Sequence, residues 1–492
     1  MAPKLVMSSV TVALLIGAAV RHRRQNRLCR HRSRPAVPSS QEDAKIQTQS
    51  ILHKAHVAWN EDRHPDAIRL YATVLQATGA SGDAPGSLDP TDHLQCHANL
   101  GSSYMTLASM CTPEDHTPNV KQREALLSAS LQHWQVAERN GPSSPMLTYF
   151  LNSVARDLSL ATSTRELSET KIESRGLTIT AIQRRDASDL SYTEFMEKYA
   201  AQGVPVVITG LTVPNWNFLL LEERYGERLV PRFRHDPRAA GEDWAALSTA
   251  DAGRIPLREH LRSLREVNGA DAPMLFDLPV AELCPELLAD FVVPRYFATD
   301  FLRTIPPEER QEIDPSPNRF PSLFAQPAGS KCGLHVDQAG THFYQMLLDG
   351  RKRWRIFNKT QTPRLYPRRH GLLFEADIFE PDLNRFPLMG TAEVMEAVLE
   401  PGEVIFVPQG SPHQVLNEDV SLAVSANFYS GIGLATSLAE LNLLSQGGAC
   451  PEYTRAADAL RRYAPSVGES LPDPGDLPWK DFDGAKWRRT SA

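Results

Sequence analysis

The sequence predicts a multidomain α+β protein, in which an N-terminal α-helical region precedes a double-stranded β-helix, or jelly roll. Within residues 46–160, small and apolar residues recur at helical offsets. Within residues 177–432, short alternating runs bounded by turn residues are typical of strands in such a fold. The polar stretch 161–176 lacks apolar periodicity and is expected to be a linker. A length of 492 residues suits two or three domains.

Composition excludes several classes of protein. Hydrophobic residues make up 41% and charged residues 23%, as in ordinary globular proteins. The net charge of −7 gives no general attraction to nucleic acid. The cysteines are scattered and contain no CxxC pair, which favours free thiols in a reducing compartment over a zinc ribbon or a disulfide scaffold. They are Cys29, Cys96, Cys111, Cys284, Cys332 and Cys450.

Residues 1–45 combine an apolar run with an arginine-rich block. The run covers residues 5–20, and residues 21–34 contain seven arginines. Because positive charge stays on the cytoplasmic side, an uncleaved anchor would leave the rest of the protein at the cytosolic face of a membrane, and we favour this prediction. An organelle-targeting segment is the alternative, since arginine and serine are abundant here and acids are absent. A disordered N-terminus remains the third reading.

The helical region contains two segments with comparable spacing of small and aromatic residues. The first runs through HKAHVAWNEDRHPDAIRLYATVLQ, and the second includes Gly101, Tyr104 and Trp134. These offsets resemble those of tetratricopeptide helix pairs, in which small residues let two helices approach closely. Such repeats usually bind peptide segments. The alternative is a helical layer packed against the following domain.

The β-rich region is predicted from a series of strand-like runs, with the helical run LREHLRSLREV between them. After it, residues 433–492 contain two amphipathic stretches, LATSLAELNLLS and TRAADALRRYA, and an extended tail. These C-terminal helices could pair two copies in a homodimer. The expected strands are LTITAI, GVPVVITGL, PSLFAQ, FYQMLL, RWRIF, EVIFVP and SLAVSANFY.

Two histidines and an aspartate in the β-rich region form a candidate metal site. His335 and Asp337 are two positions apart, so a strand would present both side chains on one face. His413 follows the run VIFVP in a turn rich in proline and glycine. Two histidines and one carboxylate are the ligands of a facial iron(II) site that leaves positions open for a cosubstrate and oxygen. The alternative is that they are ordinary hydrogen-bonded polar residues.

Lys352 is a candidate anion-binding residue. It lies in GRKRW, seventeen positions after His335. An oxoacid that chelates iron through its keto-acid end needs a cation at its other end, and a lysine can supply that charge. Strand alternation would turn Lys352 inward while Arg351 and Arg353 stay in solvent. The alternative is that all three cations belong to a solvated strand edge.

Residues 177–430 resemble the Jumonji-C, cupin-like Fe(II)/2-oxoglutarate oxygenases, and most closely their branch of lysyl hydroxylases and arginine demethylases. The resemblance implies Fe(II), 2-oxoglutarate as cosubstrate, O2, and hydroxylation of a protein side chain or its demethylation through hydroxylation. The runs that carry it are GVPVVITGL, the PMLFD…LLADFVVPRYFATDFL block, GLHVDQAGTHFYQMLLDGRKRWRIF and GEVIFVPQGSPHQVLN…LAVSANFYS.

The resemblance also assigns individual residues. In it, His335, Asp337 and His413 match the catalytic iron ligands, and Met274 occupies the place of a tyrosine that hydrogen-bonds the cosubstrate in some members. A thioether cannot donate such a bond. The residues that it assigns to cosubstrate binding or the pocket are Lys352, Ser425, Asn427, Gln345 (where close relatives carry asparagine) and Cys332 (where they often carry threonine).

Two other functions remain open from the sequence. One is a membrane-tethered helical-repeat adaptor whose cupin domain is weakly active or inactive. Another is a cupin enzyme that uses iron or another divalent metal without 2-oxoglutarate. In the favoured reading the helical region recruits a protein substrate.

Overall fold

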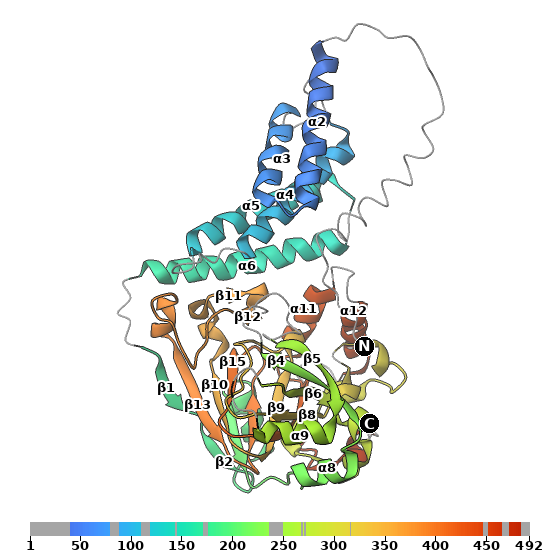
Figure 1. Cartoon of the computed structure of the whole chain (residues 1–492), viewed down its shortest axis with the longest axis vertical. Helices are drawn as coiled ribbons and strands as arrows, with labels where there is room; N and C mark the ends of the chain where they lie inside the picture. Colours follow the sequence, from blue (N-terminus) through green and yellow to red (C-terminus); the bar gives the residue numbers. More distant parts are fainter. Residues whose placement is uncertain are drawn as a thin grey trace. The chain divides into compact units, whose positions relative to one another are not determined.

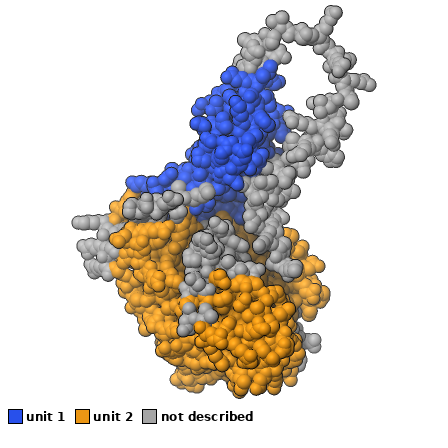
Figure 2. Space-filling model, viewed as in Figure 1, with its two compact units in different colours: residues 1–165 blue, residues 166–492 orange. Residues whose placement is uncertain are grey.

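The computed structural model describes most of the chain as two compact units, residues 1–165 and 166–492 (Figures 1 and 2). The N-terminal anchor or targeting segment lies outside the described residues, so both alternatives for it stay predictions. No helix among the residues described is long and apolar enough to cross a membrane. The described residues are 40–78, 88–109, 119–142, 145–170, 176–235, 249–266, 269, 272–314, 316–445, 451–464 and 472–483.

The first unit is helical, as the sequence predicts. Helix α4 pairs with α5 through a close contact between Gly101 and Trp134, where an added Cβ on the glycine would lie 2.7 Å from the indole ring. Ser130 donates a hydrogen bond to the main-chain oxygen of Gly101 across the same pair. The tetratricopeptide resemblance stays a prediction. The helices are α2 (Ser40–Asn60), α3 (His64–Thr78), α4 (Pro90–Ser109), α5 (Val120–Asn140) and α6 (Pro145–Glu169).

Helix α6 corrects part of the predicted linker. Residues 161–169 are helical and form its C-terminal turns, although they are polar overall. The expectation failed because Ala161 and Thr164 are buried on one face, and two small residues give little apolar periodicity.

The second unit contains a seven-stranded and a four-stranded sheet. The seven-stranded sheet has the order β2-β3-β14-β9-β16-β8-β6 and the four-stranded sheet the order β1-β13-β10-β15. A shared apolar core contains Val207 and Leu347 from the larger sheet and Trp354 from the smaller one, so the sheets pack face to face. This arrangement confirms the predicted jelly-roll fold. The strand bounds in the larger sheet are Arg184–Asp186 (β2), Val206–Thr209 (β3), Val404–Val407 (β14), His342–Asp349 (β9), Ser421–Phe428 (β16), Ser322–Gln326 (β8) and Leu275–Pro279 (β6); those in the smaller are Thr178–Ala181 (β1), Glu393–Leu399 (β13), Lys352–Ile356 (β10) and His413–Asn417 (β15).

A second apolar core covers the outer face of the larger sheet. Val206 and Ile208 of β3 enter it while Val207 enters the core between the sheets, because successive side chains of a strand alternate. Leu221 of helix α8 (Phe218–Tyr225) and Leu261 of helix α9 (Leu257–Glu266) pack into this outer core (Figure 1). The inner face of the larger sheet therefore faces the smaller sheet, and the candidate site lies between the two.

The C-terminal elements pack onto the second unit. Helices α11 (Leu434–Ser445) and α12 (Pro451–Tyr463) share an apolar cluster with Tyr429, which follows β16. Strand β17 (Leu477–Pro478) pairs with β7 (Val292–Val293), so part of the predicted tail folds back on the core. The homodimer expected through the C-terminal helices stays a prediction.

Candidate metal centre

His335 and His413 are brought together by main-chain pairing. The amide of each donates a hydrogen bond to the carbonyl oxygen of the other, at 3.0 and 2.8 Å. His413 is the first residue of β15 and pairs with Ile356 of β10, which fixes it on the inner face of the smaller sheet. The two imidazole rings consequently lie side by side, with their centroids 4.3 Å apart and their planes tilted by 54°.

Asp337 completes a three-residue cluster. Its Oδ1 lies 3.6 Å from Nε2 of His335 and 3.9 Å from Nε2 of His413. One ligand atom from each residue lies within 4.8 Å of the other two, so one cation can bind all three. The structure therefore brings together the three residues that the sequence predicted as metal ligands.

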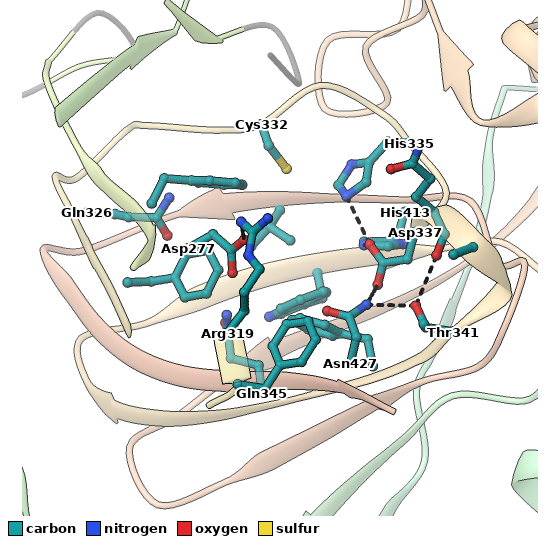
Figure 3. Close-up of a pocket in the computed structure, with 18 of the residues that line it drawn as sticks. Asp277, Arg319, Gln326, Cys332, His335, Asp337, Thr341, Gln345, His413 and Asn427 are labelled. Carbon is teal, nitrogen blue, oxygen red and sulfur yellow. Dashed lines mark hydrogen bonds and ion pairs between the residues drawn. The ribbon is translucent and has the colours of Figure 1, made fainter. Parts of the chain in front are cut away.

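Neighbouring hydrogen bonds orient every ligand of this cluster. Nδ1 of His335 is 2.8 Å from the carbonyl oxygen of Gly333, and Nδ1 of His413 is 3.0 Å from that of Ser411. A carbonyl accepts only from N–H, so each Nδ1 carries a proton and Nε2 is the atom that can bind a metal. Asn427 donates from Nδ2 to Oδ2 of Asp337 at 3.0 Å, which leaves Oδ1 for the cation (Figure 3).

The electrostatics of the cluster suit a bound cation. Burial lowers the pKa of His413 to about 4, so its ring is neutral near pH 7. Burial also disfavours the charged form of His335, but hydrogen bonds with Asp337 and Cys332 outweigh that cost and raise its pKa to about 10. Without a metal, the cluster thus retains a proton beside the carboxylate. A metal ion bound by these atoms would displace that proton.

The cluster opens into a pocket between the two sheets. Its cavity of about 140 Å³ holds a small organic molecule rather than a single ion, since one water needs about 10–15 Å³ on the same measure. In Figure 3 the metal-ligand cluster and Asn427 lie on one side of this pocket and Gln326 on the other. The predicted site residues that line it are Cys332, His335, Asp337, Gln345, Lys352, His413 and Asn427.

Lys352 is a buried cation in this pocket. Strand β10 alternates as predicted, with Lys352 1% exposed and Arg353 in contact with solvent. Its Nζ donates to Oε1 of Gln326 at 2.5 Å, and no carboxylate of the described residues lies within ion-pair distance of it. Burial lowers the pKa of Lys352 to about 7. A buried ammonium without a counter-ion is costly, so the pocket is built to receive an anion.

Gln345 leaves a polar atom unused in the same pocket. It is 3% exposed, and its Oε1 has no hydrogen-bond partner in the structure. Buried polar atoms are rarely unpaired, and an orphaned one in a pocket marks a place for a ligand or water. Cys332, also in the pocket wall, lies beside His335, and its pKa is lowered because hydrogen bonding with His335 outweighs the effect of burial.

Ser425 and Met274 are both buried, and neither lines the cavity. Ser425 is buried behind the pocket wall, with its Oγ 3.4 Å from that of Ser322, and it does not line the cavity. The expected contact of Ser425 with a cosubstrate stays a prediction. Its neighbour Ser322 donates to Asp277, which lines the pocket. Met274 is also fully buried, and its Sδ contacts Nε2 of Gln326.

Gln326, Asp277 and Arg319 are among the pocket residues that the sequence did not single out. Gln326 ends β8, and Asp277 accepts an ion-pair hydrogen bond at 3.0 Å from Arg319, which comes from a separate short turn (Figure 3). Gln326 precedes His335 by nine positions in PSLFAQPAGSKCGLH. Alternation along PSLFAQ was the available signal, because it puts Ser322, Phe324 and Gln326 on one face. Nothing in the sequence pairs Asp277 with Arg319.

Comparison with known proteins agrees with this geometry. Residues 192–433 match a family model described as a cupin-like domain. The chain is 30% identical to the lysine-specific demethylase JMJ21 of Arabidopsis thaliana over 50% of this chain and 25% of that protein. It is 28% identical to the bifunctional arginine demethylase and lysyl-hydroxylase psr-1 of Caenorhabditis elegans over 51% of this chain and 62% of that protein. It is 25% identical to the human 2-oxoglutarate and iron-dependent oxygenase JMJD4 over 50% of this chain and 60% of that protein. The chain thus spans from a quarter to about six-tenths of the length of these relatives.

Proposed function

We propose that this protein is an Fe(II)- and 2-oxoglutarate-dependent dioxygenase, because residues 192–433 match a cupin-like domain and the relatives include Jumonji-C oxygenases. Its product would be a hydroxylated side chain of a protein substrate, or a demethylated one when the oxidised carbon is an N-methyl group. The observation that carries the proposal is one pocket that contains both the His335–Asp337–His413 cluster and the buried cation Lys352.

The donor atoms of the cluster fit iron(II). Two imidazole nitrogens and one carboxylate oxygen form the facial set typical of non-haem iron oxygenases, with positions left for other ligands. A bound iron(II), together with 2-oxoglutarate and O2, would supply the oxidation of an unactivated C–H bond. His335, Asp337 and His413 hold the metal, and Asn427 keeps the carboxylate turned toward it.

The rest of the pocket fits a dicarboxylate cosubstrate. The ammonium of Lys352 has no counter-ion among the described residues, so the distal carboxylate of 2-oxoglutarate would satisfy it. The ring of Phe324 lies 5.7 Å from Nζ of Lys352, and the burial of this end of the pocket keeps water from competing for the cation. Lys352 thereby positions the cosubstrate, while the histidines and the aspartate position the metal.

A protein substrate is the class that the relatives favour. The psr-1 protein, 28% identical over 51% of this chain, is named as a bifunctional arginine demethylase and lysyl-hydroxylase. We propose that the helical region, with its tetratricopeptide-like spacing, recruits that substrate. Its helices expose polar faces that suit a peptide more than a small metabolite.

An anaerobic titration of the full chain tests the proposal. Iron(II) and 2-oxoglutarate together should produce a metal-to-ligand charge-transfer absorbance band. His335→Ala should remove the band by removing the metal, while Lys352→Ala should keep metal binding and weaken binding of 2-oxoglutarate. Arg351→Ala is the matched control, because this neighbouring cation is exposed and pairs with Asp419. A folded, metal-binding wild type that gives no band would contradict the proposal.

A further inference from the structure

Lys352 and Gln326 form a buried polar pair whose hydrogen-bonding capacity is only partly used. The Nζ of Lys352 donates to Oε1 of Gln326 at 2.5 Å, and Gln326 is 4% exposed. The direction of this bond assigns the amide atoms, because an ammonium can only donate and its partner must be the oxygen. The nitrogen of the same amide, Nε2, therefore points to the other side.

The contact made by Nε2 is a weak one. Its partner is the Sδ of Met274 at 3.3 Å, and a thioether is a poor acceptor. A buried amide N–H that lacks a good acceptor costs free energy, which a better acceptor would recover. Gln326 lines the pocket and Met274 does not, so a ligand in the pocket can reach this amide.

Two other polar residues that line the pocket, Asn417 and Arg319, are already engaged. Asn417 donates from Nδ2 to the carbonyl oxygen and hydroxyl of Ser330, and its Oδ1 accepts from Ser421. The guanidinium of Arg319 pairs with Asp277. Ser425, where the resemblance implied a hydroxyl donor, lies behind the wall, and Met274 has no donor. Among the pocket-lining residues that the structure describes, Gln326 is the amide donor in contact with Lys352.

We propose that Gln326 is a second binding residue for the distal carboxylate of the cosubstrate, which it holds together with Lys352. In the ligand-free protein its Oε1 orients the ammonium. When the carboxylate arrives, Lys352 transfers its hydrogen bond to it, and Nε2 donates to the second carboxylate oxygen after the amide turns about its terminal torsion. That torsion is broad and roughly two-fold, so the turn meets little resistance.

The inference rests on the proposed function, and it explains how this chain binds a dicarboxylate although Met274 and Ser425 supply no donor. It also makes Gln326 a specificity residue. A keto acid without a distal carboxylate, such as 2-oxobutyrate, has nothing for Gln326 or Lys352 to bind, so its affinity should not depend on either side chain.

The test measures the binding of both keto acids to full-length protein with iron(II) in the absence of oxygen. Gln326→Leu should weaken binding of 2-oxoglutarate roughly 10- to 100-fold, the loss of one hydrogen bond to a charged group. Its affinity for 2-oxobutyrate and for iron(II) should stay within about twofold of wild type. Gln326→Glu should weaken 2-oxoglutarate binding further, because the new carboxylate pairs with Lys352.

Met274→Leu is the control for packing changes near the amide, and it should keep both affinities. A double variant with Lys352→Met should show coupling, because Gln326→Leu costs little once the cation is absent. A 2-oxoglutarate affinity of Gln326→Leu equal to that of the wild type would overturn the inference and leave the proposed function intact. Failure of the wild type to bind 2-oxoglutarate would overturn both. If Gln326→Leu does not fold, Gln326→Met decides, because it keeps the length of the side chain and removes both amide atoms.

Discussion

The two imidazoles of the candidate site face one carboxylate oxygen because each carries its proton on the other ring nitrogen. Main-chain carbonyl groups of Gly333 and Ser411 fix this tautomer, and Asn427 occupies the second carboxylate oxygen of Asp337. Such outer contacts contribute to metal affinity because a ligand that is already oriented loses little freedom on binding. The preorganisation is therefore a property of the chain itself.

Lys352 should destabilise the ligand-free protein, although it favours the binding of an anionic cosubstrate. Replacement of a buried ion by an apolar residue of similar volume is neutral or stabilises by about 1–4 kcal/mol, so we expect Lys352→Met to raise the melting temperature at pH 6–7. Burial lowers the pKa of Lys352 from 10.5 to about 7. The unfolded chain thus binds more protons above pH 7, and the stability of the wild type should rise with pH relative to Lys352→Met between about pH 7 and 10.

Thermal unfolding of the ligand-free proteins across that pH range measures this effect. Arg351→Met is the control, since its exposed pair with Asp419 should change stability by less than about 1 kcal/mol with no such pH trend. Two results would contradict the prediction: a Lys352→Met variant that is less stable than the wild type at pH 6, or a stability difference between the two proteins that stays constant between pH 7 and 10.

At the scale of elements, the alternation of side chains along a strand was the most direct guide from the sequence to the candidate site. It predicted that Lys352 turns inward on β10, and the β-runs placed the His-x-Asp pair and His413 in one domain. Alternation did not decide which inward residues reach the cavity. Ser425 and Asn427 lie two positions apart on β16, yet only Asn427 lines the pocket. Ser425 lies opposite Ser322 of β8, and such neighbours cannot be foreseen because strand order is not visible in one sequence.

The pair of helices α4 and α5 depends on one glycine. Alanine normally stabilises a helix by about 1 kcal/mol relative to glycine. At Gly101, however, the added Cβ would lie 2.7 Å from Cε2 and Nε1 of Trp134, whose ring is fixed by stacking on Phe150 at 4.7 Å. Overpacking of this kind costs about 1–3 kcal/mol, so the clash should outweigh the gain in helix propensity.

We therefore expect Gly101→Ala to lower the melting temperature of the helical unit, measured by far-ultraviolet circular dichroism. Thr106→Ala on the same helix is the control, because its hydroxyl bonds the main chain of Ser102 and its loss should have little effect. Stabilisation by Gly101→Ala would mean that the helices separate at no cost and that the close contact does not hold the pair.

At the scale of the whole molecule, the chain is divided into a helical unit and a unit that contains the entire candidate site. The three metal ligands lie between residues 335 and 413, inside residues 166–492. Binding to the native state of one unit stabilises that unit by mass action, but it stabilises the other only to the extent that their unfolding is coupled. Metal addition is therefore a probe of how independent the two units are.

We expect calorimetry of the full chain to show two unfolding transitions, of which a divalent metal raises only one. The shifted transition should be that of residues 166–492, and a metal present at 100 times its Kd adds about 2.7 kcal/mol to its stability. His335→Ala should abolish the shift without moving the other transition, while Gly101→Ala should lower the metal-independent one. A single transition that responds to all three changes would mean that the helical unit unfolds together with the metal domain, and a substrate bound to one unit could then alter the stability of the other.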